Sequence, residues 1–177
     1  MQYIINLGNK KTAVSTLALF SLKKMDVEIK ITNTHIAEIN KILKQKVFKK
    51  DALFVNSETL WEIMQPTGKK GKHNYHGLSP EKVYEALSTI RFSKDVIVSY
   101  DERYLILTLA TIFSDVNIAI IVTPKGSSKI KHNQMINRII TIYPYRKKWV
   151  SIQALTSKTR YSTVLIWFHN WPKDAIL

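Results

Sequence analysis

The spacing of hydrophobic residues changes from the first half of the chain to the second. In the first half, apolar residues recur every three or four positions over residues 36–47 and 57–65, which is typical of one face of a helix. Shorter apolar runs predict three strands, at residues 3–7, 27–31 and 52–55. Charged residues alternate with apolar ones over 27–31, as in a half-exposed strand. For residues 12–23 the pattern leaves helix and strand open.

The second half consists mainly of β-branched runs separated by turn residues. Four runs predict consecutive antiparallel strands, at residues 95–99, 104–108, 116–122 and 138–143. We expect a long loop over 124–133, an end to the fourth strand at Pro144, a helix over 146–155 and a last apolar segment over 161–168. Helices followed by a run of strands indicate an α+β fold, with a helical layer packed on an antiparallel sheet of four or more strands.

A segment rich in glycine and lysine, residues 68–80, separates two of the predicted helices. Ser79 and Pro80 are typical of a helix N-terminus, and Ser57 suits the same role for the preceding helix. Within the segment, lysines can hold phosphate oxygens, and a neutral imidazole can move a proton near pH 7. The alternative is a solvated basic loop whose histidines have no catalytic role.

Length and charge narrow the possible partners. The 177 residues suit one domain, residues 27–177, preceded by residues 1–26 as an N-terminal extension or strand–helix appendage. The chain has 27 Lys and Arg against 13 Asp and Glu, a net charge of +14, which indicates a polyanionic partner. Nucleic acid, and RNA in particular, is the first candidate. We expect no membrane contact, because the basic segment 41–50 lacks the tryptophan that would anchor a membrane-surface helix.

The positions of the acidic residues and the absence of cysteine limit which metals and cofactors the protein can bind. No Asp or Glu occurs between Val116 and Lys173, although ten Lys and Arg do, so this half lacks the oxygen ligands that Mg²⁺ needs. The chain has no cysteine, which removes thiolate nucleophiles and Cys-type zinc sites. We therefore expect no metal and no other cofactor. No apolar run reaches membrane-spanning length and no signal-peptide cleavage site occurs, so we expect a cytoplasmic protein.

The remaining residue types suit phosphodiester cleavage without a metal. RNA can be cleaved by attack of its own 2′-hydroxyl, so the protein needs to supply only a base, an acid and cations. The candidate catalytic residues are Lys72, His73, His76, Ser99, Thr141 and Tyr143. The candidate nucleic-acid-binding residues are Lys69, Lys70, Arg138, Lys158, Arg160 and Tyr161. Taken singly, the strand residues are also ordinary members of a sheet.

Four short motifs follow one another along the chain: Asp-Ala-Leu-Phe-Val-Asn-Ser-Glu-Thr-Leu at 51–60, Lys-His-Asn-Tyr-His-Gly-Leu-Ser-Pro-Glu at 72–81, Ile-Val-Ser at 97–99 and Ile-Thr-Ile-Tyr at 140–143. Their succession resembles phage-encoded members of the barnase/EndoU/colicin/RelE-like nuclease toxin fold. The resemblance implies helices packed on a four-stranded antiparallel sheet, with RNA cleavage on the concave sheet face. His76, Ser99, Thr141 and Tyr143 match the positions of its site residues. It also implies a phage or mobile-element origin and a cognate antitoxin or immunity protein as partner.

Two functions remain open on this basis. The first is a toxin-type endoribonuclease in which His76 or His73 is the general base or acid, and Lys72, Arg138 and Arg160 neutralise the phosphate. Ser99, Thr141 and Tyr143 would orient the scissile bond. The second is a non-catalytic protein that uses its basic face to bind nucleic acid or to inhibit a nucleic-acid-handling complex. Histidines placed beside Lys72 favour the nuclease, because a binding protein has no need of them.

Overall fold

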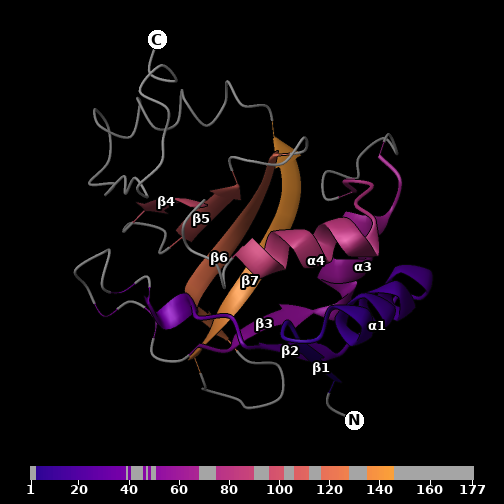
Figure 1. Cartoon of the computed structure of the whole chain (residues 1–177), viewed down its shortest axis with the longest axis horizontal. Helices are drawn as coiled ribbons and strands as arrows, with labels where there is room; N and C mark the ends of the chain where they lie inside the picture. Colours follow the sequence, from indigo (N-terminus) through magenta and orange to yellow (C-terminus); the bar gives the residue numbers. More distant parts are fainter. Residues whose placement is uncertain are drawn as a thin grey trace.

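A computed structural model describes residues 3–38, 40, 46, 48, 51–67, 75–89, 96–101, 106–111, 117–127 and 135–145. In this part of the chain the elements follow the order β1 (Tyr3–Asn6), α1 (Lys10–Leu22), β2 (Glu28–Thr32), a 3₁₀ turn η1 (Ile36–Glu38), β3 (Leu53–Asn56), α3 (Ser57–Met64), α4 (Pro80–Thr89), β4 (Val96–Asp101), β5 (Ile106–Thr111), β6 (Asn117–Ser127) and β7 (Met135–Tyr145) (Figure 1). None of the helices described there has the length and apolar character needed to cross a lipid bilayer.

The strands form one mixed sheet in the order β1-β2-β3-β7-β6-β5-β4. Strands β4 to β7 pair antiparallel in sequence order, as predicted. However, β1 runs parallel to β2, and β3 runs parallel to β7. The prediction of an α+β fold is therefore confirmed, but the prediction of a purely antiparallel sheet is wrong. Parallel neighbours need a long connection, which α1 supplies between β1 and β2 and residues 57–134 supply between β3 and β7.

The helices α1, α3 and α4 pack together over the sheet and enclose the core (Figure 1). Phe20 of α1, Leu60 of α3 and Leu87 of α4 are fully buried in one apolar cluster with Ile5 of β1. We expected residues 1–26 to form an extension or appendage. In the structure, β1 extends the sheet and α1 packs on α3 and α4, so both elements share the core of the rest of the chain.

The helix starts follow from capping side chains. Asn9 caps α1, because its Oδ1 accepts a hydrogen bond from Thr12 N at 3.1 Å. Ser79 caps α4 as predicted, accepting from Lys82 N at 3.3 Å. The cap of α3 is Asn56 rather than the predicted Ser57, since Asn56 Oδ1 accepts from Glu58 N at 3.2 Å. Ser57 is instead buried, and its hydroxyl accepts from Val27 N and donates to the carbonyl of Met25.

Several predicted boundaries differ from the structure. Of the helix expected over 36–47, the structure describes the turn η1 and residues 40 and 46; the rest of that range lies outside the described residues, as do the segments 146–155 and 161–168. Strand β6 continues to Ser127 through part of the expected loop, and β7 runs on through Pro144 to Tyr145. A proline is tolerated in a strand where its missing N–H faces an unpaired edge. Among the described residues, β7 has no strand partner on its β3 side at Pro144.

Candidate functional site

The candidate site lies where β7 extends past its neighbour β3. The register between the two strands covers only two pairs, Leu53 with Asn137 and Phe54 with Arg138. After Asn56 the chain leaves the sheet and enters α3, which packs on β7. Within the part of the chain that the structure describes, residues 139–145 of β7 therefore have no strand partner on that side (Figure 1).

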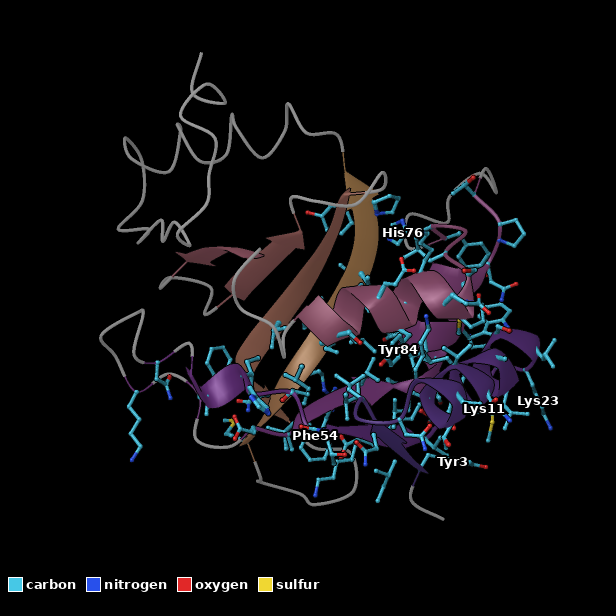
Figure 2. All side chains as sticks on the ribbon, viewed as in Figure 1. Tyr3, Lys11, Lys23, Phe54, His76 and Tyr84 are labelled. Carbon is cyan, nitrogen blue, oxygen red and sulfur yellow. The ribbon has the colours of Figure 1, made fainter. Side chains whose placement is uncertain are left out.

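A short segment before α4 brings His76 to this edge. Gly77 has a φ of +65°, a left-handed conformation that glycine adopts without strain. Its N–H donates to the carbonyl of Gln65 at 2.8 Å, and Leu78 N donates to the carbonyl of Ile63 at 3.1 Å. Tyr75 and Leu78, on either side, are buried. These bonds fix the segment to the C-terminal end of α3 and place His76 beside β7 (Figure 2).

His76 meets two of the predicted site residues on β7. Its Nε2 lies 3.4 Å from Thr141 Oγ1, within hydrogen-bonding distance. Its ring centroid lies 6.0 Å from that of Tyr143, with the two rings tilted by 47°. All three side chains are half-buried, so each keeps a face open to a ligand. The structure thus joins residues that are 65 or more positions apart in the sequence.

Burial shifts the protonation of this cluster towards neutral forms. It lowers the pKa of His76 below its ordinary value near 6.5, because the charged imidazolium loses solvation. It raises the pKa of Tyr143 above its ordinary value near 10 for the same reason, since the phenolate is the charged form. At neutral pH the cluster therefore combines an uncharged imidazole, which can accept a proton, with two protonated hydroxyl groups. Among the described residues, no group of three His, Asp or Glu side chains is placed to hold a metal ion.

Arg138, a predicted nucleic-acid contact on the same strand, is engaged elsewhere. Its Nη2 donates to Glu28 Oε2 of β2 at 3.1 Å, across the intervening strand β3. The side chain of Arg138 is 22% exposed and that of Glu28 is 4% exposed. The alternation of residues 27–31 predicted an exposed Glu28, but that prediction is wrong, because Arg138 covers the carboxylate from two strands away. The sequence pattern within β2 carries no signal of this partner.

Of the predicted site residues that remain, the structure describes only the backbone of Ser99, and that backbone lies away from the His76 cluster. Ser99 lies on β4, which β5 and β6 separate from β7. Three strand spacings amount to about 14 Å, so the backbone of Ser99 is far from the His76 cluster. The structure does not describe the side chain of Ser99. The remaining predictions lie outside the described residues: Lys69, Lys70, Lys72, His73, Lys158, Arg160 and Tyr161.

The chain matches no known family model, and no curated protein and no solved structure shows significant similarity to it.

Proposed function

We propose that this protein is an endoribonuclease of toxin type that cleaves RNA by attack of the 2′-hydroxyl on the adjacent phosphorus. The observation that carries the proposal is the placement of the uncharged imidazole of His76 beside the hydroxyl of Thr141 and the ring of Tyr143. The high positive charge of the chain supports RNA as the substrate.

His76 acts in this proposal as the group that moves a proton. Its neutral ring accepts the proton of the 2′-hydroxyl while the 2′-oxygen bonds to phosphorus. The bond from phosphorus to the 5′-oxygen then breaks, and that oxygen takes a proton from an acid, leaving a 2′,3′-cyclic phosphate and a 5′-hydroxyl end. Tyr143 suits the role of hydrogen-bond donor, because its raised pKa keeps the phenol protonated. Thr141 orients the imidazole through the contact at Nε2.

The cations of the proposed site come from outside this cluster. Arg138 is held by Glu28, so Lys72 and Arg160 remain the proposed phosphate ligands, with Lys69, Lys70, Lys158 and Tyr161 as further contacts to RNA. The antiparallel run from β4 to β7, with α3 and α4 packed near it, supports a relationship to the barnase/EndoU/colicin/RelE-like fold. A nuclease of that kind would be paired with an inhibitor protein.

The test is cleavage of RNA by the purified chain in the presence of EDTA. We expect discrete fragments that carry 2′,3′-cyclic phosphate ends. The variant His76→Asn should cleave about 10²–10⁴ times more slowly, the usual contribution of general acid–base catalysis, with RNA affinity nearly unchanged. The matched control is His35→Asn, since His35 is exposed and asparagine also tolerates its φ of +56°.

A second function is favoured by one observation, the engagement of Arg138 by Glu28, which removes a cation from the neighbourhood of His76. In that case the protein is a non-catalytic binder of nucleic acid or of a complex that handles it. Absence of cleavage of any RNA by the wild type, with RNA binding intact, would support this function. So would a His76→Asn variant that cleaves as fast as the wild type, because the fragments would then come from another source.

A further inference from the structure

The outer face of α1 carries two leucines that the fold leaves exposed. Leu19 is 63% exposed and Leu22 is 81% exposed, whereas Ala13, Leu17 and Phe20 on the inner face are buried in the core. Leu19 and Leu22 are three residues apart, so they lie next to each other on the helix surface. Burying either leucine would remove apolar surface from water, and nothing in the core requires them to be leucine.

Lysines lie at both ends of this apolar pair. Lys10 and Lys11 begin α1, and Lys23 and Lys24 follow its last residue. Lys11 and Lys23 are exposed, while Lys24 pairs with Glu58 of α3. Residues 1–25 contain no Asp or Glu at all. Glu81 of α4 lies near Lys10, and Asp26 follows the segment, so the outer face of α1 combines the exposed leucines mainly with the exposed lysines Lys11 and Lys23.

We propose that the outer face of α1, formed by Lys11, Leu19, Leu22 and Lys23, binds the surface of an anionic lipid membrane. The leucines enter the boundary between headgroups and acyl chains, and the lysines lie at the level of the lipid phosphates. Such a helix binds parallel to the membrane plane and does not span it. A single pair of leucines gives weak and reversible attachment.

Other occupants fit this face less well. Nucleic acid would use the lysines but gains nothing from two leucines on a convex helix surface. A second copy of the chain would cover the leucines, but a twofold contact here would also bring the lysines of both copies together. The sequence predicts no membrane contact, because the basic segment 41–50 lacks tryptophan. That prediction concerns residues 41–50 and not α1, because the sequence pattern of residues 12–23 leaves helix and strand open.

The proposed membrane face is separate from the His76 cluster. Figure 2 shows Lys11 and Lys23 on α1, with α4 lying between them and His76. A protein attached through α1 therefore keeps the edge of β7 accessible to a ligand from solution. The lipid contact and the proposed cleavage of RNA are independent, and either can hold without the other.

The test is co-sedimentation of the full chain with lipid vesicles near physiological salt. We expect binding to phosphatidylcholine vesicles that contain about 30% phosphatidylserine, and little binding to phosphatidylcholine alone, because the attraction to lysine depends on anionic lipid. The double variant Leu19→Ser/Leu22→Ser should bind the anionic vesicles about tenfold more weakly. Lys11→Gln/Lys23→Gln should weaken binding by a similar factor.

The control is Met135→Ser, which removes a 63% exposed apolar side chain at the start of β7 and should bind like the wild type. The leucine variants should keep the thermal midpoint of the wild type, since both positions are exposed. Wild-type binding by the leucine double variant would overturn the proposal, because adsorption would then rest on net charge alone. Equal binding to both vesicle types, or no binding to anionic vesicles, would overturn it as well.

Discussion

Strand β7 has two parts, residues 135–138 and residues 139–145, and polar side chains in the two parts have different surroundings. In residues 135–138, Arg138 lies opposite Phe54 of β3 and reaches across that strand to a buried carboxylate. In residues 139–145, Thr141 and Tyr143 lie past the end of β3, and their side chains meet His76. Arg138 and Thr141 are only three positions apart, yet one is tied into the sheet and the other faces a half-open site.

The difference coincides with the end of the pairing between β3 and β7 and with the register shift between β6 and β7 at Ile140. Where a neighbouring strand covers the edge, a charged side chain finds an internal partner and loses contact with solvent. Where the neighbour ends, the polar groups of the strand stay available to a side chain from a loop and to a ligand. Because β7 is longer than β3, residues 135–138 of β7 have a structural role and residues 139–145 contribute to the candidate site.

The largest loss of stability is expected from the part of β7 that contains its pairs with β3, residues 135–138, which includes Arg138. Glu28→Ala leaves the mostly buried guanidinium of Arg138 without its carboxylate, and breaking such a pair typically costs about 3–5 kcal/mol of unfolding free energy. Urea unfolding measures the change. The matched control is Glu85→Ala, which breaks the exposed pair between Lys82 and Glu85 and should cost no more than about 0.5 kcal/mol. Equal losses in the two variants would show that Arg138 is not tied into the sheet.

The second largest loss of stability is expected from an apolar residue in the part of β7 that does not pair with β3, residues 139–145. Ile142 is fully buried against the core, so Ile142→Ala should lower the unfolding free energy by roughly 2–5 kcal/mol through cavity formation. Ile140 lies two residues away but is exposed, and Ile140→Ala should change stability by less than about 0.5 kcal/mol. Residues two apart in a regular strand share a face, but the register between β6 and β7 shifts at Ile140, which has no partner on β6. Similar losses at both positions would contradict this irregularity.

A smaller effect is expected from the hydroxyl groups of Thr141, which contacts His76, and of Tyr143, whose ring lies beside it. Tyr143→Phe and Thr141→Val remove one hydroxyl each with little change of shape, so the unfolding free energy should change by about 1 kcal/mol or less. If the proposed cleavage uses these hydroxyls, the rate should fall by roughly tenfold in each variant. Single-turnover cleavage assays measure this. A rate that falls only in proportion to lost folded protein would assign both residues to the sheet alone.

The smallest effect is a pH dependence of stability. Because burial lowers the pKa of His76 in the folded chain, the unfolded chain binds more protons between that lowered pKa and about 6.5. Stability should therefore be highest above pH 6.5 and fall as the pH drops through this window. Urea unfolding of the wild type and of His76→Asn, compared from pH 7.5 to about pH 5, isolates the contribution of His76. Parallel curves for the two proteins would show that His76 does not titrate differently on folding.

The sequence predicts features whose causes are local. Ser79 and Pro80 mark the start of α4, and the β-branched runs mark β4 to β7 with their antiparallel order. His76, Thr141 and Tyr143 were singled out by residue type and by family resemblance, and the structure brings them together.

Features that depend on distant partners could not be predicted. The parallel pairing of β3 with β7 joins segments about 80 positions apart, and neither segment carries a mark of the other. The burial of Glu28 depends on Arg138, which lies 110 positions away. The assignment of residues 12–23 was left open because Leu19 and Leu22 place apolar residues on the solvent side of α1, which weakens the helical periodicity.

The hydrogen bonds of Gly77 and Leu78 to the end of α3 have a consequence for how this protein can evolve. They hold Gly77 and Leu78 next to Gln65 and Ile63, so the two ends of the stretch 66–76 are joined by backbone hydrogen bonds that do not depend on side chains within it. Lengthening a closed loop is inexpensive, since each doubling costs only about 0.6 kcal/mol in closure entropy. Insertions or substitutions at Lys69, Lys70 or Lys72 could therefore alter which ligand is recognised without moving His76. A side chain at Gly77 would be strained at its positive φ, so this glycine is the position where such variation must stop.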